Sequence, residues 1–124
     1  MALRELDQAN RRIERYGAGG FVIEGGTYKG AILVTGRAIV ALALEDAASA
    51  DADSVAAIIA ARDDFEMILI GTGARFGLLA KPAREALRDA GVRFDCMDTG
   101  AACRTYNVLV AEGRRVAAAL LPVP

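Results

Sequence analysis

Hydrophobic and polar residues follow different patterns in the two halves of the chain. In the first half, short apolar segments alternate with glycines, which predicts strands joined by tight turns. The segments 21–24 and 27–34 flank Gly25-Gly26 and are expected to form a hairpin. A second turn at Thr35-Gly36 then leads into a predicted strand over 37–44, which is apolar and partly β-branched.

The second half alternates between helical and strand-like periods. Apolar residues at helical spacing predict helices that begin at Asp53 or Ser54, at Pro82 and at Thr99. Short apolar runs predict strands over 66–70, 92–97 and 115–121. Strands separated by such helices pair in parallel through right-handed crossovers. The expected fold class is therefore α/β, with a central mixed, mostly parallel sheet, helices packed on it and an N-terminal antiparallel β-hairpin region.

The length and the apolar content predict one domain with a well-covered core. At 124 residues the chain can bury a core without disulfides or metals, and 54% of its residues are apolar. We divide the domain 1–124 into an N-terminal arm (1–16), β-hairpins (17–44) and an alternating α/β core (53–121). The apolar excess predicts a fully covered sheet or a subunit interface, so a homo-oligomer is possible. The apolar tail 116–124 is expected to cover a sheet edge or a partner protein.

Charge and residue counts exclude several functional classes. Fifteen Lys and Arg against sixteen Asp and Glu give a net charge of −1, so no nucleic acid partner is expected. No apolar run is long enough for a transmembrane segment, and the acids within 1–16 argue against a targeting signal. A cytoplasmic protein is expected. The chain has no histidine, which excludes Ser-His-Asp triads, Cys-His pairs and the usual zinc sites. Any catalysis would use carboxylates, thiols, Lys, Arg, Tyr or a borrowed cofactor, and we assign no metal and no cofactor.

A glycine-containing turn follows the strand 66–70. Gly71 and Gly73 in "ILIGTGARFG" lie where doubly wound folds bind nucleotides, but Phe76 replaces the third glycine of the dinucleotide fingerprint. A tight turn at the strand end is favoured over dinucleotide binding. A small anion held by the amides of 71–73 and by Arg75 is a less demanding alternative.

The stretch "MDTGA" matches the aspartic-protease signature, in which two aspartates share a proton and activate water. In that class the motif leads into strands, whereas here a helical stripe follows directly. A helix start capped by Thr99 and favoured by the charge of Asp98 explains the motif better. A protease is therefore not favoured.

Cysteines and polar residues near this helix start have both functional and structural interpretations. Cys103 lies on the apolar stripe of the helix and Cys96 within a strand, so burial is favoured over a reactive thiol. Arg104 and Asn107 share the opposite face with Gly100. They can hold a carboxylate or phosphate, or they can bond neighbouring backbone, which is the favoured interpretation.

The Gly71 turn and the Thr99 helix start both follow strands predicted to be parallel. They are therefore expected at the same edge of the sheet, where α/β folds bind ligands. The candidate anion-binding or ligand-binding residues are Gly71, Thr72, Gly73, Arg75, Thr99, Gly100, Arg104 and Asn107. No catalytic residue is assigned.

The segments 68–73, 98–107 and the tail to Leu121 resemble a domain-of-unknown-function family. This family includes mitochondrial NADH dehydrogenase (complex I) assembly factor three and the adipogenesis-associated MTH-type domain proteins. Weaker similarity occurs at 15–21 and Gly30, and a tryptophan found in many members between 37 and 64 is absent here. The resemblance implies a compact three-layer MTH-type α/β domain with a role in binding or assembly, and it implies no catalytic residues.

These observations leave two functional hypotheses. The first is a non-enzymatic protein-interaction or assembly domain with an unidentified protein partner, a bacterial relative of the complex I assembly factors. The bacterial origin is suggested by the alanine-rich composition. The second is a small anionic-ligand-binding protein, or an enzyme, with its site between the Gly71–Arg75 turn and the Thr99–Asn107 helix start. The first is favoured because no convergent catalytic set is evident.

Overall fold

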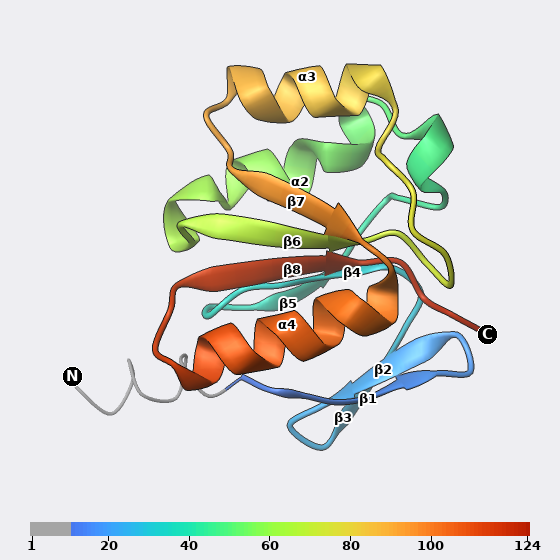
Figure 1. The fold of residues 1–124 in the computed structure, drawn as a ribbon, viewed down its shortest axis with the longest axis vertical. Helices are drawn as coiled ribbons and strands as arrows, with labels where there is room; N and C mark the ends of the chain where they lie inside the picture. The colour runs from blue at the N-terminus through green and yellow to red at the C-terminus, as the bar shows by residue number, and fades with distance from the viewer. Residues whose placement is uncertain (1–10) are drawn as a thin grey trace.

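The strands form two sheets of unequal size. The computed structural model describes residues 11–124 (Figure 1). The smaller sheet is antiparallel, in the order β1-β2-β3, and the larger sheet has the order β5-β4-β8-β6-β7. The strands span Ile13–Gly17 (β1), Gly20–Ile23 (β2), Gly26–Lys29 (β3), Ile32–Val34 (β4), Ile39–Ala41 (β5), Met67–Gly71 (β6), Phe94–Met97 (β7) and Val116–Leu120 (β8).

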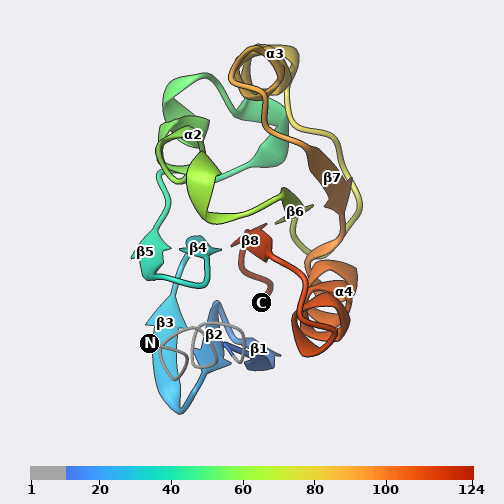
Figure 2. The same cartoon turned by 90° about the vertical axis from the view of Figure 1, so that its left-hand side faces the viewer.

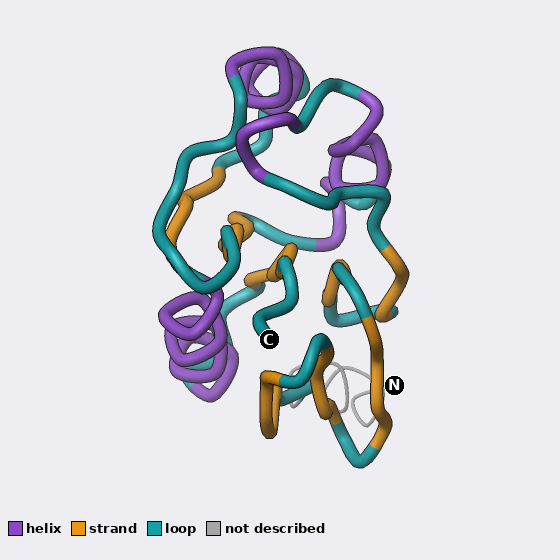
Figure 3. Tube along the Cα trace, turned by 90° about the vertical axis from the view of Figure 1, so that its right-hand side faces the viewer, coloured by secondary structure: helices purple, strands orange, loops and turns teal. Residues whose placement is uncertain are grey.

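The helices cover both faces of the larger sheet. They span Ala47–Ser49 (η1), Asp53–Val55 (η2), Ala56–Ala60 (α2), Arg62–Asp64 (η3), Lys81–Asp89 (α3) and Thr99–Ala111 (α4), where η marks 3₁₀ turns. One core lies between the sheet and α2 and α3, and the other lies between the sheet, α4 and the smaller sheet. The result is the expected three-layer α/β domain (Figures 2 and 3).

The C-terminal segment forms the centre of the larger sheet. β8 pairs in parallel with β6 and antiparallel with β4, and all five of its residues are buried. Its alternate residues contribute to different cores: Ala117 and Ala119 face α2 and α3, whereas Ala118 and Leu120 face α4. The prediction that the tail covers an edge or a partner is wrong for 116–120, because a strand this apolar is buried most completely in the middle of the sheet. The sheet is mixed, as predicted: β5, β8, β6 and β7 run in the same direction, and β4 runs against them.

The smaller sheet begins earlier than expected and turns at different residues. β1 occupies 13–16 of the predicted arm, and 1–10 lie outside the described residues. The hairpin at Gly25-Gly26 is confirmed, but its turn residues are Glu24 and Gly25, both with positive φ, while Gly26 pairs with Ile23. Two positive φ values are the signature of the type I′ turn, whose twist matches that of the strands.

The predicted strand 27–34 is two strands that belong to different sheets. β3 ends at Lys29, and Gly30 takes a φ of +78° before the chain enters β4. Glycine adopts this left-handed conformation without a steric penalty, so the chain can change sheets there. The turn at Thr35-Gly36 is confirmed, because the Thr35 amide donates to the Ala38 carbonyl oxygen at 2.9 Å.

The predicted helix at Asp53 or Ser54 is a broken one, with the 3₁₀ turns η2 and η3 on either side of α2. Neither predicted side chain caps α2. The Asp51 carboxylate instead accepts from the Ser54 amide at 2.9 Å, which closes the preceding turn and lowers the pKa of Asp51. A short polar side chain bonding to nearby backbone competes with a regular helix start.

Candidate functional site

The predicted ligand-binding segments meet at the carboxyl ends of two neighbouring strands. β6 pairs in parallel with β7, and Gly71 lies opposite Met97 in the register. The loop after Gly71 therefore lies beside the start of α4, and the Thr72 amide donates to the Met97 carbonyl oxygen at 2.8 Å. The expected placement of both segments at one sheet edge is confirmed.

Thr99 joins three segments through hydrogen bonds at this edge. Its Oγ1 donates to the Leu121 carbonyl oxygen at 2.7 Å and accepts from the Gly73 amide at 2.9 Å. Its own amide donates to the Gly73 carbonyl oxygen at 2.9 Å. The residue is completely buried, so no water competes for these bonds. Thr99 therefore links the Gly73 loop, α4 and the residue that follows β8.

Gly71 permits this close approach. A Cβ placed on Gly71 would lie 2.9 Å from Thr99 Cα and 3.0 Å from Leu120 Cδ2. Separations this short are repulsive, so only glycine fits without a shift of neighbouring atoms. Gly71 therefore allows β6 and the start of α4 to pack in direct contact.

The N-cap of α4 is Asp98 rather than Thr99, which corrects the predicted cap. The Asp98 carboxylate accepts from the Ala101 amide at 2.9 Å, as Asp does at helix starts. Thr99 is the first helical residue, and its hydroxyl bonds to other segments. α4 begins within "MDTGA", at Thr99, so the interpretation of Asp98 as a helix-start residue is confirmed.

Thr72 closes the loop that follows β6. Its Oγ1 donates to the Arg75 carbonyl oxygen at 2.8 Å and accepts from the Gly77 amide at 2.9 Å. The Arg75 residue itself is exposed. The Thr72 hydroxyl therefore holds the glycine-containing segment as a tight turn. This is the interpretation favoured from the sequence, in which Phe76 replaces the third glycine of the dinucleotide-binding fingerprint.

Asn107 and Arg104 both contact β1. The Ile13 amide donates to Asn107 Oδ1 at 2.9 Å, and Asn107 Nδ2 donates to the Ile13 carbonyl oxygen at 2.8 Å. Asn107 thus bonds backbone as a neighbouring strand would, which is the interpretation that the sequence favoured. Arg104 donates to Tyr16 Oη at 3.4 Å. A Cβ on Gly100 would lie 2.6 Å from the same oxygen, so Gly100 makes room for Tyr16.

The eight candidate residues therefore form two groups. At the sheet edge, Gly73 bonds to Thr99, Gly71 packs against Thr99, and Thr72 bonds to Met97 and within its own loop. Gly100, Arg104 and Asn107 face β1, and Arg75 is exposed on the loop. Bonds and packing within the chain involve most of these residues. Among residues 11–124, the Arg104 guanidinium donates to Tyr16, and the Arg75 guanidinium has no hydrogen-bond partner.

The two thiols and Tyr106 are shielded to different degrees. Cys103 is buried and Cys96 is half-buried, and both are free thiols. Burial raises the pKa of the Cys103 thiol to about 12, and burial also raises the pKa of Cys96. Burial likewise raises the pKa of Tyr106, whose hydroxyl donates to the Arg11 carbonyl oxygen at 2.8 Å. These groups are protonated at neutral pH, so the Cys103 thiol is a weak nucleophile.

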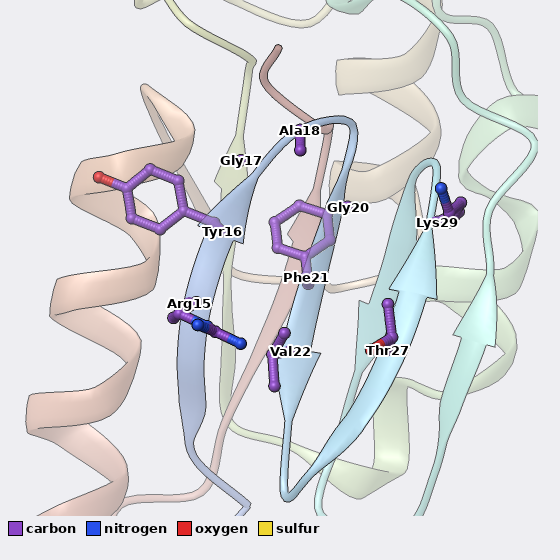
Figure 4. Close-up of a pocket in the computed structure, with 9 residues that line it drawn as sticks. All are labelled: Arg15, Tyr16, Gly17, Ala18, Gly20, Phe21, Val22, Thr27 and Lys29. Carbon is purple, nitrogen blue, oxygen red and sulfur yellow. The ribbon is translucent and has the colours of Figure 1, made fainter.

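A hollow that the sequence did not reveal lies on the smaller sheet (Figure 4). It has a volume of about 530 Å³, and its lining includes two cations, Arg15 and Lys29, and no acid. Gly17 and Gly20 contribute no side chains to it, which leaves the space open. Cross-strand register brings the two cations to one sheet, although they are far apart in the sequence. Such a surface can hold an anionic group.

Residues 11–124 contain no group of three or more His, Cys, Asp or Glu side chains positioned to bind a metal ion. Within the same residues, none of the helices has the length and apolar character needed to cross a membrane.

The structure is a three-layer α/β domain. At the carboxyl ends of β6 and β7, the loop after Gly71 and the start of α4 bond chiefly to one another. The chain belongs to the family described as proteins of unknown function, DUF498/DUF598, whose model matches residues 13–121. This membership confirms the family resemblance seen in the sequence.

Two relatives show the range of the family. The chain is 38% identical over 112 residues to an uncharacterized protein of Rhodobacter capsulatus, covering 90% of this chain and 85% of that protein. It is 31% identical over 121 residues to the human NADH dehydrogenase [ubiquinone] 1 alpha subcomplex assembly factor 3, covering 98% of this chain. The aligned part is 65% of the human protein, so the chain spans less than two thirds of that relative.

Solved structures show the same fold. A Bartonella henselae protein described as an outer membrane protein matches with a TM-score of 0.83 and 34% identity, covering 93% of this chain and 97% of that one. A Bordetella pertussis protein described as an Mth938-like domain matches with a TM-score of 0.74 and 28% identity. That match covers 92% of this chain and 87% of the other. The MTH-type fold is therefore confirmed.

Proposed function

We propose that this chain is a non-enzymatic protein-interaction domain that assists the assembly of a respiratory NADH dehydrogenase in the bacterial cytoplasm. The observation that carries the protein-binding part is the loop between β6 and α3, which exposes two large apolar side chains. Phe76 is 63% exposed and Leu78 is 57% exposed. The assembly part is supported by the similarity to assembly factor 3 along almost the whole chain.

The loop is held in a defined conformation. The hydroxyl of Thr72 bonds on both sides of Phe76, to Arg75 and to Gly77. At the other end, the Leu79 side chain is buried and the Ala80 amide donates to the Ala47 carbonyl oxygen at 2.9 Å. Phe76 and Leu78 therefore project from a loop that is anchored at both ends.

Such a loop suits protein binding. Burying a Phe or Leu side chain stabilises a complex by about 1.5–3 kcal/mol relative to leaving it in water. Aromatic and Arg side chains dominate the binding energy of protein interfaces, and Arg75 is exposed beside Phe76. An anchored loop also loses little conformational entropy when it binds. A partner with an apolar pocket would fit this surface.

Replacement of both apolar side chains tests the proposal in a bacterium that encodes this chain. We expect the Phe76→Ser/Leu78→Ser variant to lower the amount of assembled, membrane-bound NADH dehydrogenase severalfold, as deletion of the gene would. Both side chains are exposed, so the variant protein should accumulate normally. Native electrophoresis with NADH dehydrogenase staining measures the assembled complex.

The matched control is Val108→Ser on α4, because Val108 is also 57% exposed. This variant should behave as wild type. Unchanged assembly after gene deletion would refute the assembly role. A defect in the deletion strain but not in the Phe76→Ser/Leu78→Ser strain would refute the role of the loop.

As a second candidate function, the chain binds a small anion, or acts as an enzyme on one, between the Gly71–Arg75 turn and the Thr99–Asn107 helix start. The observation that favours it is that neither Arg75 nor Arg104 forms an ion pair with any residue in the range 11–124. A bound phosphate or carboxylate would neutralise these charges and accept their hydrogen bonds.

Thermal-shift measurements with phosphates, nucleotides and carboxylates test anion binding. If a millimolar anion binds there, the melting temperature of the wild type should rise by a few degrees and that of Arg75→Gln/Arg104→Gln should not. Arg15→Gln/Lys29→Gln is the matched control, since it removes two cations from the hollow on the smaller sheet. No stabilisation of the wild type, or equal stabilisation of the Arg75→Gln/Arg104→Gln variant, would contradict this location.

A further inference from the structure

β5 is an edge strand of the larger sheet (Figure 2). The Thr35 amide donates to the Ala38 carbonyl oxygen and the Leu42 amide to the Ala31 carbonyl oxygen, both at 2.9 Å. Directly opposed residues of antiparallel strands alternate between hydrogen-bonded and non-hydrogen-bonded pairs. Val40, opposite Leu33, is therefore bonded to β4. The amide and carbonyl groups of Ile39 and Ala41 point the other way, out from the free edge of the sheet.

β5 lacks two of the features by which proteins prevent strand pairing, a charged side chain and a proline, while its length of three residues limits the extent of any pairing. β5 consists of Ile39, Val40 and Ala41, without a charge or a proline, and Val40 is 43% exposed. The opposite edge strand, β7, carries the exposed Asp95. Charged side chains on an edge strand disfavour the addition of another strand. Of the two edges of this sheet, β5 is the one open to pairing.

An apolar groove lies beside β5 on the face covered by α2. Its volume is about 280 Å³. Its lining includes the small side chains of Ala57, Ala60 and Ala61, and one acid, Asp64. Val40 lines the same groove, opposite Leu33 of β4. The small neighbouring side chains leave Val40 partly uncovered on this side.

We propose that a second copy of this chain pairs with β5 antiparallel about a two-fold axis at Val40, which joins the two larger sheets. Ile39 of each copy then lies opposite Ala41 of the other copy. The outward amide and carbonyl groups of these two residues satisfy one another across the axis. The two Val40 side chains face each other and cover their exposed surfaces.

Charge favours an identical partner over an arbitrary strand. Arg37 precedes β5 and Glu45 follows it, and both are exposed. Antiparallel pairing of two copies places the Arg37 end of each strand beside the Glu45 end of the other. Arg37 bonds to Asp64 within its own copy at 3.1 Å and remains largely exposed. The contact is short, so the dimer should dissociate on dilution.

Sedimentation velocity over a concentration series tests the dimer. Wild type should change from monomer to dimer as concentration rises, and Val40→Glu should raise the dissociation constant about tenfold or more because two carboxylates would meet at the axis. Ala41→Pro should weaken the dimer as well, since it removes an outward amide and no bond to β4. Val108→Glu on the exposed face of α4 is the matched control and should dimerise as wild type does.

Mixing variants tests the register. Val40→Glu and Val40→Lys should each be mainly monomeric alone and form a heterodimer when mixed, because position 40 faces its own counterpart. A wild type that stays monomeric at every concentration refutes the proposal. This outcome includes the case in which β5 pairs with a strand of a different protein, because the purified chain would then be monomeric. A dimer that Val40→Glu leaves intact, or variants that do not combine, also refutes it.

Discussion

Thr99→Val should lower the free energy of unfolding by about 2–3 kcal/mol. Valine keeps the shape of threonine but removes the hydroxyl, which leaves the Gly73 amide and the Leu121 carbonyl oxygen without this partner. Thr99 is completely buried, so water cannot replace the lost bonds without a local opening of the structure. Denaturant unfolding followed by circular dichroism measures the change.

Two further variants separate the hydroxyl from the rest of the side chain. Thr99→Ser keeps the hydroxyl and should lose only about 1 kcal/mol, for the missing methyl group. Thr27→Val makes the same replacement on an exposed strand position and should change stability by less than about 0.5 kcal/mol. If Thr99→Val were as stable as Thr27→Val, the hydrogen bonds by which Thr99 links the Gly73 loop to Leu121 would not stabilise the domain.

Cys103 should react with a thiol reagent about a thousandfold more slowly in the folded protein than in the unfolded chain at the same pH, from the thiolate fraction alone. Burial raises the pKa of this thiol from 9.0 to about 12, so little thiolate forms near neutral pH. Burial of the sulfur lowers the rate further. The Cys96→Ser variant isolates Cys103, and mass spectrometry with and without denaturant measures the rate of labelling.

The Cys103→Ser variant provides the comparison, since it leaves only the half-buried Cys96.

The raised pKa of the Cys103 thiol also makes the stability of the domain depend on pH. The folded state keeps the Cys103 proton above pH 9, where the unfolded chain loses it, so this contribution to stability is complete below pH 9 and is lost as the pH rises towards 12. Fast labelling of native Cys103 near neutral pH would show that the thiol is accessible and ionised.

Most elements of the second half could be predicted because their signals are local. The apolar run of β6, the proline at the start of α3 and the helical stripe through Cys103 and Tyr106 each depend on neighbouring residues. Burial of Cys103 followed from its place on that stripe. β1 was missed because its polar residues give it no clear apolar alternation, and it is fixed in place largely by Asn107 and β2.

The candidate site was predicted in part. Parallel pairing of β6 and β7 correctly placed Gly71 and Thr99 at one edge. The sequence did not show that Thr99 would bond to Leu121, because that contact exists only when β8 lies beside β6. The hollow on the smaller sheet also depends on strand register, which aligns Arg15 with Val22 and Val22 with Thr27.

The sequence by itself determined the fold class, the family, most helix and strand positions and the inward face of α4. These follow from periodicity, turn residues and similarity, which are properties of short segments or of the aligned chain. Only the tertiary structure decided that the apolar tail is the central strand, that Asp98 rather than Thr99 caps α4, and that Phe76 and Val40 are exposed. The physical reason is that burial and hydrogen-bond partners depend on which distant strands become neighbours.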